Sequence, residues 1–181
     1  MTKLDFPSEK ILEDYIFENI TKYGDCPISG YEAFLSFRQF NLGAYGIPDI
    51  VKMVSRNDCM EITVLELKVE PLKPAHLAQL CRYVTGMNEL VGKYKKHFNI
   101  KVFGELAGPL ELGNDLVFLA DHVGHNITIH DLSLSMDDGL VSEQVPRGWT
   151  KTGSDAADKN LSKRIYQAFV AYNKIGNAGS K

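Results

Sequence analysis

The sequence predicts an α/β protein in which helices flank a mixed β-sheet. A segment with apolar residues at helical spacing precedes three strand-like runs, a second helical segment and a fourth strand-like run. Short turns between the first three runs favour antiparallel pairing, whereas strand, helix and strand in succession favour a right-handed parallel crossover. The 181 residues are enough for one full core or at most two small domains.

The first helix is predicted over residues 8–22. Ser8 follows Pro7 and can cap the helix N-terminus, and Gly24 marks the end of the helix. The apolar stripe that predicts this helix consists of Ile11, Leu12, Tyr15, Ile16 and Ile20.

Three strands are predicted next, over residues 33–41, 47–55 and 60–70. Turn-forming residues separate them at 42–46 and 56–58. The third run is apolar on both faces, which is typical of a strand in the centre of a sheet.

The second helix is predicted from residue 75 to about residue 96. Pro71 and Pro74 end the preceding strand, and Pro74 can occupy the first turn of the helix. Its apolar stripe consists of Leu77, Leu80, Cys81, Val84, Met87, Leu90 and Val91.

Further strands are predicted over 99–107 and 126–134, and the stretch 115–123 between them fits either a helix or a strand. We place the main domain at 1–134. Residues 135–181 are expected to pack on the same domain. Within that part we expect a loop over 135–158, a helix over 159–174 and a flexible tail over 176–181.

Composition excludes several classes of protein. The formal net charge is −3, so the chain is not a polycation that coats nucleic acid by bulk charge. Cys26, Cys59 and Cys81 are odd in number and widely spaced, which argues against a disulfide framework and against a four-cysteine metal site. With no apolar run of about 20 residues and no signal-like N-terminus, we expect a cytoplasmic protein that does not associate with membranes.

The strongest chemical signal lies in the third predicted strand. Glu66 and Lys68 are two residues apart, so they share one face of a strand that is otherwise apolar. Charges in such a strand are costly unless they are paired or bind a metal. A simple ion pair at the end of the strand is the alternative interpretation.

Asp49 strengthens the metal interpretation. It lies in an apolar run 17 positions before Glu66, and an antiparallel hairpin with a short turn would place the two carboxylates side by side. Two carboxylates beside Lys68 form a hard-oxygen site for Mg²⁺ or Mn²⁺. Considered alone, Asp49 could instead be a turn or cap aspartate after Pro48.

The second predicted helix adds polar side chains near this strand. Gln79 and Tyr83 are four residues apart and therefore lie on one helical face, with His76 and Arg82 on neighbouring faces. The helix begins just after Lys68, so its first two turns can reach the predicted site.

Three short segments together resemble the PD-(D/E)xK nuclease superfamily. They are Gly-Ile-Pro-Asp at 46–49, Glu-Leu-Lys at 66–68 and Gln-Leu-Cys-Arg-Tyr at 79–83. The last segment has the QxxxY pattern of the RecB-type branch. The resemblance covers roughly residues 8–105 and implies a restriction-endonuclease-like αβββαβ core. The chain lacks the cysteine cluster of iron–sulfur relatives and has no helicase motif.

The resemblance implies hydrolysis of phosphodiester bonds by a nuclease that depends on Mg²⁺ or Mn²⁺, with DNA favoured over RNA. Asp49 and Glu66 would hold the metal, assisted by the Leu67 carbonyl. An acidic residue of the first helix would join them, and we assign this role to Glu13. Glu9 and Glu18 are the alternative candidates for this role.

The resemblance also implies catalytic roles for three polar side chains. Lys68 would orient the attacking water or stabilise developing charge. Gln79 and Tyr83 would position the scissile strand or the water molecules of the metal. The alternatives are a catalytically inactive relative that binds nucleic acid or a protein partner, and an enzyme that cuts RNA.

Several polar and basic residues are candidates for contacts with nucleic acid. They are Arg38, Gln39, Arg82, Lys93, Lys95 and Lys96. A second basic region, residues 147–181, has a net charge of +5, and within it Trp149 could stack on a base. The alternative for both basic regions, 93–96 and 147–181, is that they form an ordinary solvated surface. The alternative for Trp149 is that its side chain packs in the core.

Three histidines, His122, His125 and His130, fit no zinc-binding spacing and are expected to be ordinary polar residues. A homodimer is plausible because a monomer of this size covers little DNA, although the sequence indicates no interface.

Overall fold

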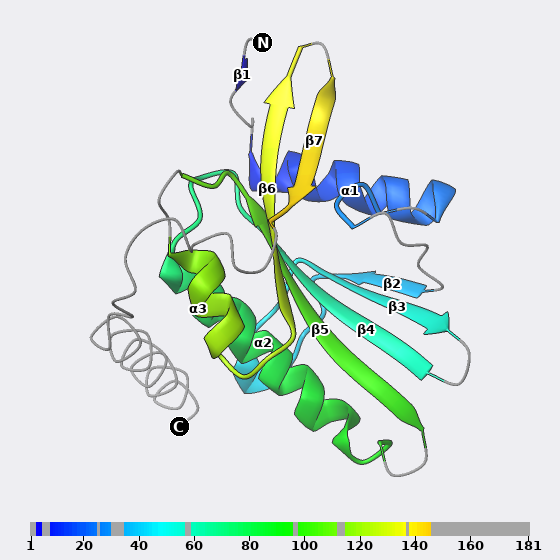
Figure 1. Ribbon diagram of the computed structural model, residues 1–181. Coiled ribbons are helices and arrows are strands. Elements are labelled where there is room, and N and C mark those ends of the chain that lie inside the picture. Colours follow the sequence, from blue (N-terminus) through cyan, green and yellow to red (C-terminus); the bar gives the residue numbers. More distant parts are fainter. Residues whose placement is uncertain are drawn as a thin grey trace.

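In the residues that it describes, a computed structural model contains a seven-stranded sheet (Figure 1). The mixed pairing of this sheet and its flanking helices confirm the prediction from the sequence. The structure describes residues 3–4, 8–24, 26–29, 35–56, 59–95, 98–111, 115–136 and 138–145. The strands are β1 (Lys3–Leu4), β2 (Leu35–Arg38), β3 (Ile50–Arg56), β4 (Cys59–Leu67), β5 (Asn99–Gly108), β6 (Ile127–Ser135) and β7 (Gly139–Gln144). The helices are α1 (Glu9–Tyr23), α2 (Pro74–Gly92) and α3 (Leu116–His122), with a short 3₁₀ turn, η1 (Gly43–Tyr45), between β2 and β3.

The sheet combines the two kinds of pairing that the sequence predicts. Its strand order is β1-β6-β5-β4-β3-β2, and β7 also pairs with β6. Strands β2, β3 and β4 are antiparallel neighbours. Strands β4, β5 and β6 are parallel, and α2 and α3 make the two connections between them. The stretch that fitted either helix or strand is therefore a helix, α3.

Local signals set the ends of the two long helices. The hydroxyl of Ser8 accepts a hydrogen bond from the Ile11 N–H at 3.2 Å, and Gly24 ends α1 in a left-handed conformation with φ of 73°. Pro74 lies in the first turn of α2, as expected. The predicted helix at 75–96 is longer than α2, which stops at Gly92.

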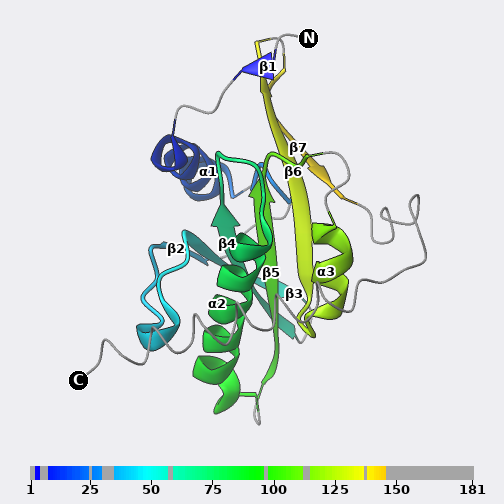
Figure 2. The ribbon, with the colours of Figure 1, turned by 90° about the vertical axis from the view of Figure 1, so that its left-hand side faces the viewer.

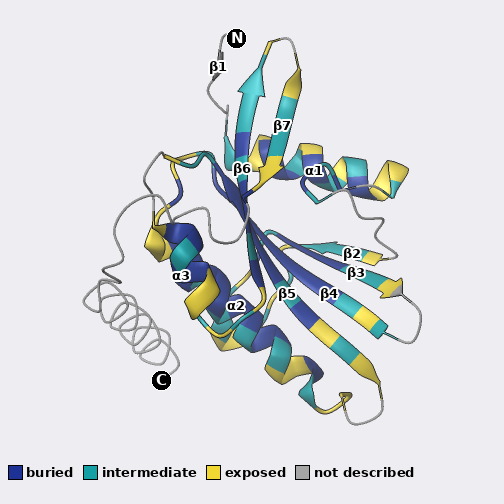
Figure 3. Cartoon of the chain, in the orientation of Figure 1, coloured by how far each residue is buried: buried dark blue, intermediate teal, exposed yellow. Residues whose placement is uncertain are grey.

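Apolar side chains form a core on each face of the sheet. Helices α2 and α3 run along one face (Figures 1 and 2), where residues such as Val64, Leu80 and Leu106 pack together. Helix α1 covers the other face through a cluster that includes Ile16 and Leu65. The central strands are buried near the middle of the molecule and exposed at the ends farthest from α1 (Figure 3). The apolar character of β4 on both faces follows from this double coverage.

The α1 face also buries one ion pair away from the predicted site. Lys52 is 1% exposed, and its Nζ lies 3.0 Å from Oε2 of Glu105. Lys52 also donates a hydrogen bond to the Ser29 hydroxyl. His130 is buried close by, and burial lowers its pKa. Paired in this way, a buried lysine avoids the large cost of an isolated buried charge.

Some predicted boundaries are wrong. The loop predicted over 135–158 contains β7, which forms a hairpin with β6. The sequence of β7 gives little strand signal because its outer residues are polar, and pairing with β6 decides its conformation. The predicted strand at 47–55 starts only at Ile50, since Pro48 and Asp49 precede it. The predicted helix at 159–174 and the tail lie outside the described residues.

In the part of the chain that the structure describes, no helix is long and apolar enough to cross a membrane.

Candidate active site

The candidate site lies where β3 begins and β4 ends. The antiparallel register pairs Ile50 with Leu65, so the next step along each strand places Asp49 opposite Glu66, as the hairpin argument predicts. Oδ2 of Asp49 accepts a hydrogen bond from the Leu67 N–H at 2.8 Å. This bond continues the pairing of the two strands and fixes the Asp49 carboxylate beside β4.

Glu66 is the most buried acid of the site, with an exposed fraction of 1%. Its Oε1 lies 2.9 Å from Nζ of Lys68 and accepts a hydrogen bond from the Gln79 amide at 2.7 Å. Its Oε2 is buried and has no hydrogen-bond partner among the described residues. A buried carboxylate oxygen without a partner is costly, and a bound cation would satisfy it.

The two carboxylates hold on to their protons more strongly than usual. Burial raises the pKa of Glu66 to about 8, and the neighbouring charge of Asp49 adds to the increase. Burial likewise raises the pKa of Asp49 to about 6, although the Leu67 N–H opposes this effect. Two carboxylates that cannot easily ionise together are a favourable place for a divalent cation.

Lys68 stays charged within this acidic surrounding. Burial would lower its pKa, but the combined attraction of the carboxylates of Glu66, Asp49 and Glu9 outweighs this and raises the pKa above its usual range. Its Nζ also lies 3.4 Å from Oε2 of Glu9. The Lys68 N–H donates to the Ala107 carbonyl at 2.8 Å, so the chain remains paired with β5 just beyond the end of β4.

Helix α2 supplies Gln79 and Tyr83 to the site, as their spacing predicts. The Gln79 amide donates to Oε1 of Glu66 and to the Tyr83 hydroxyl, at 2.7 and 2.8 Å. Tyr83 is 4% exposed, and burial raises its pKa. Gln79 therefore links the Glu66 carboxylate of β4 to the Tyr83 hydroxyl of α2, and its amide holds both groups in place.

His76 occupies the first turn of α2 next to this group. Its Nδ1 accepts a hydrogen bond from the Lys73 N–H at 3.2 Å, which leaves Nε2 to donate to Oε1 of Glu70 at 3.1 Å. Burial and the charge of Lys68 lower the pKa of His76. A neutral His76 thus helps to start the helix that carries Gln79. No pattern in the sequence predicts this role of His76.

Glu13 lies on the buried side of α1, and its negative charge contributes to the raised pKa of Asp49. Its two oxygens accept hydrogen bonds from Arg38 Nε at 2.9 Å and from the Gln39 amide at 3.1 Å. Arg38 also pairs with Asp14 at 2.7 Å. Arg38 and Gln39, expected to contact nucleic acid, are thus directed at α1 in this structure.

The remaining predicted residues are spread more widely. Of the two rivals of Glu13, Glu9 reaches Lys68, whereas Glu18 pairs with Lys22 on the exposed side of α1. The contact that Leu67 makes in the site is through its N–H, and its carbonyl as a metal ligand stays a prediction. Arg82 lies beside Tyr83, with its guanidinium carbon 5.3 Å from the ring centroid.

The basic residues at the end of α2 are away from the site. Lys93 and Lys95 are exposed in the turn that follows the helix, whereas Lys96 lies outside the described residues. Of the three histidines, His122 and His125 bond to nearby groups on α3 and α2, whereas His130 is buried on the α1 face. Trp149 lies outside the described residues.

The donors present fit a divalent metal held by few protein ligands. Among the described residues, no three His, Cys, Asp or Glu side chains are grouped closely enough to hold a metal without other ligands. Mg²⁺ commonly binds through one or two carboxylates and keeps several water molecules. Asp49 and Glu66, with the unpartnered Oε2 of Glu66, match that kind of site.

Gly46 packs closely against Tyr83 of α2 at the edge of the site. Gly46 has a φ of 102°, and a Cβ at this position would lie 2.7 Å from the Tyr83 ring. At Gly86, a Cβ would lie 2.5 Å from the ring of Tyr45 in η1. The segment between β2 and β3, which leads to Asp49, can therefore lie directly on α2 beside Tyr83.

Comparisons of the chain with protein-family models, with curated proteins and with solved structures find no match. Function is therefore inferred from the side chains of the site and from their geometry.

We expect Glu66→Gln to change how stability depends on pH. In the wild type, the unfolded chain loses the Glu66 proton as the pH rises through 4.5, while the folded chain keeps it until about 8. The folded state therefore binds more protons over this interval, and the free energy of unfolding decreases as the pH rises. Glutamine cannot ionise, so the variant should gain stability relative to the wild type between about pH 5 and about pH 8.5.

Urea denaturation in the presence of EDTA measures this difference at both pH values. Glu18→Gln is the matched control, because Glu18 is exposed on α1. Its free energy of unfolding relative to the wild type should change little between the two pH values. If the free energy of unfolding of Glu66→Gln, relative to that of the wild type, stays constant or decreases as the pH rises, Glu66 is not buried in its protonated form.

Gly46→Ala tests the packing between Gly46 and Tyr83. The new methyl group would meet the Tyr83 ring and would also strain a backbone with positive φ, so we expect a loss of about 1–3 kcal/mol in the free energy of unfolding. Gly43→Ala is the control, because Gly43 also has a positive φ but nothing lies within 4 Å of its added Cβ. Equal losses in the two variants, measured by urea denaturation, would show that strain alone accounts for the effect.

Proposed function

We propose that the protein is a nuclease of the PD-(D/E)xK class that hydrolyses phosphodiester bonds, with DNA favoured as substrate, and that depends on Mg²⁺ or Mn²⁺. The observation that carries the proposal is the pair of the partly buried Asp49 and the buried Glu66, in which Oε2 of Glu66 has no partner among the described residues. Lys68 contacts the same carboxylate at 2.9 Å. This combination of two acids and one lysine is suited to phosphoryl chemistry.

The fold supports the proposal in a general way. The elements run in the order α1, β2, β3, β4, α2 and β5, and their pairing is antiparallel and then parallel, which supports the proposal. The three segments that carry the resemblance lie at the start of β3, at the end of β4 and in the first half of α2. They converge on one site although they are spread over 38 positions, from Gly46 to Tyr83.

Each residue of the site has a role that follows from its contacts. Asp49 and Glu66 would hold the cation, which when bound polarises a phosphoryl oxygen and lowers the pKa of a water molecule. Lys68 carries three donors and bonds to Glu66 and Glu9, so it can direct a further N–H at the attacking water or at developing negative charge. The Gln79 amide keeps the Glu66 carboxylate in one orientation.

A cleavage assay tests the proposal. Labelled single-stranded DNA, duplex DNA and RNA are incubated with Mg²⁺, Mn²⁺ or EDTA. We expect cleavage only with metal, none above the metal-free background for Asp49→Asn or Glu66→Gln, and a rate reduced by at least about 100-fold for Lys68→Ala. Lys68→Ala should still bind Mn²⁺, because both carboxylates remain.

Controls for this assay lie on the exposed side of α1. Glu18→Gln and Lys22→Ala remove the same kinds of charge as the site variants but change only a surface pair, so both should cleave at the wild-type rate. Cleavage that is equal in EDTA would contradict the metal mechanism. A folded wild type that neither cuts any of the three substrates nor binds Mn²⁺ would contradict the proposal.

Binding of Mn²⁺ should release protons, because a metal binds the ionised form of a carboxyl. At pH 7 the Glu66 carboxyl, with a pKa of about 8, is largely protonated, so the apparent affinity should rise by up to about tenfold per pH unit until about pH 8. Calorimetry in two buffers of different ionisation enthalpy counts the released protons. An affinity that is flat between about pH 6 and about pH 8, without proton release, would place the metal elsewhere.

A further inference from the structure

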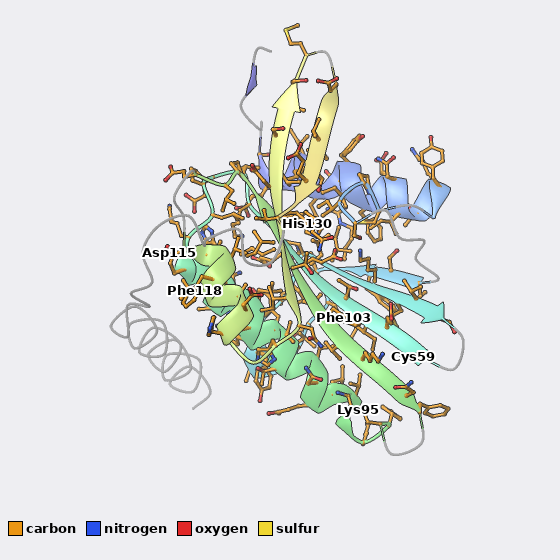
Figure 4. All side chains as sticks on the ribbon, viewed as in Figure 1. Cys59, Lys95, Phe103, Asp115, Phe118 and His130 are labelled. Atoms are coloured by element: carbon orange, nitrogen blue, oxygen red, sulfur yellow. The ribbon has the colours of Figure 1, made fainter. Side chains whose placement is uncertain are left out.

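A concave surface lies at the end of the sheet away from the candidate active site. It has a volume of about 610 Å³, lies between the end of α2 and the strands β3, β4 and β5, and its lining contains no charged side chain. Its lining residues are Met53, Ser55, Cys59, Met60, Ile62, Val91, Tyr94, Phe98, Asn99 and Ile100. Figure 4 labels Cys59 and Lys95 at this end of the molecule. We call it the α2-end pocket.

The α2-end pocket exposes aromatic side chains beside positive charge. Tyr94 is 47% exposed and Phe98 is 64% exposed. Lys93 and Lys95 are exposed in the same turn, and Nζ of Lys93 lies 4.9 Å from the Tyr94 ring centroid. Large exposed aromatic rings are costly in water, so their grouping around a pocket points to a ligand.

The side chains of the α2-end pocket match the chemistry of an unpaired nucleotide. Exposed aromatic rings stack on the faces of bases, and lysines contact phosphates. Ser55 and Asn99 provide hydrogen-bonding groups in a lining that is otherwise mostly apolar. The volume lies within the range of small-ligand pockets, which is large enough for a base. Bases stacked inside a duplex present no free face to such a pocket.

We propose that the α2-end pocket binds unpaired bases of single-stranded nucleic acid, with Tyr94 and Phe98 stacking on bases and Lys93 and Lys95 contacting phosphates. The proposal rests on the proposed function, since it names a feature of the substrate of that nuclease. It adds a binding site that is separate from the carboxylate pair.

The α2-end pocket and the candidate active site share one face of the sheet. In β4, Met60, Ile62 and Glu66 alternate onto the α2 side. Glu66 is six residues after Met60 along β4, a distance of about 20 Å in a strand. About six stacked nucleotides, at roughly 3.4 Å each, cover this distance. Because Ile62 and Val64 are buried beneath α2, a strand that reaches both places passes around the helix, and about six nucleotides is the shortest length that can connect them.

Binding is measured in EDTA, where no cleavage is expected. Fluorescence anisotropy compares an oligothymidylate of about 20 nucleotides, longer than the roughly 4–16 nucleotides that a single-strand-binding fold covers, with a duplex of the same length. We expect the single strand to bind more tightly. Tyr94→Ala and Phe98→Ala should each weaken its binding by at least about fivefold. Lys93→Ala should reduce the salt dependence of binding.

A matched control comes from α1. Tyr23 is 74% exposed at the far end of that helix, so Tyr23→Ala removes an exposed aromatic ring away from the α2-end pocket. Its affinity for the single strand should equal that of the wild type. Equal affinity for duplex and single strand, or an unchanged affinity in both Tyr94→Ala and Phe98→Ala, would overturn the proposal.

Cys59 gives a second measurement at the α2-end pocket itself. It lines the pocket and is partly exposed, whereas Cys26 and Cys81 are buried, and burial raises the pKa of Cys81 to about 12. Iodoacetamide should therefore alkylate Cys59 first in the folded protein. Oligothymidylate should slow this reaction, and duplex DNA should slow it less. Cys59→Ser identifies the reacting thiol.

The two proposals fail in different ways. A protein without metal-dependent cleavage contradicts the proposed function, but single-strand binding in EDTA and protection of Cys59 would still support the α2-end pocket. A protein that cuts DNA while its Cys59 is alkylated at the same rate with and without oligothymidylate overturns the pocket proposal alone. That second result would favour an apolar segment of a protein partner as the ligand.

Discussion

The antiparallel register between β3 and β4 is the constraint on which the site depends. It places Asp49 opposite Glu66, and the bond from the Leu67 N–H to Asp49 holds that arrangement at the end of the hairpin. A slip of one residue would turn one of the two carboxylates to the opposite face of the sheet, because successive side chains of a strand alternate. A slip of β3 would also take Lys52 out of its buried ion pair with Glu105, because each side chain of the slipped strand would change face. The core of the protein therefore sets the geometry of its chemistry.

Burial in the same core means that the carboxylates of the site reduce the stability of the folded protein. Glu66 is almost fully buried, one of its oxygens lacks a partner among the described residues, and its pKa is raised to about 8. Lys68 offsets part of that cost, and Gln79 satisfies the other oxygen in part. A site designed only for stability would replace Glu66 with an apolar residue. A buried acid with incomplete partners is typical of a functional site that gives up stability for binding.

The sequence predicted the centre of the site better than its surroundings. Asp49, Glu66, Lys68, Gln79 and Tyr83 lie together because short-range rules apply to them: alternation along a strand, a short hairpin and the four-residue spacing of a helix. The bonds from Arg38 and Gln39 to Glu13 were not predicted, since they join residues 25 and 26 positions apart through the packing of α1 on β2. The contacts of Gly46 with Tyr83 and of Gly86 with Tyr45 were missed for the same reason. Strand β7 was missed because its partner β6, and not its own composition, determines its conformation.

Helix α2 connects the two surfaces to which we assign functions. Its first half carries Gln79 and Tyr83 into the candidate active site, and the turn after its last residue carries Lys93 and Tyr94 to the α2-end pocket. The helix packs along β4 and β5 over its length, through residues such as Leu80, Val84 and Met87. A helix fixed in this way keeps a constant distance between its ends. Under both proposals, the fixed distance between the ends of α2 would set the smallest number of nucleotides between a base held at the α2-end pocket and the bond that is cut. The core packing beneath α2 would then limit how close to its bound base a single strand is cleaved.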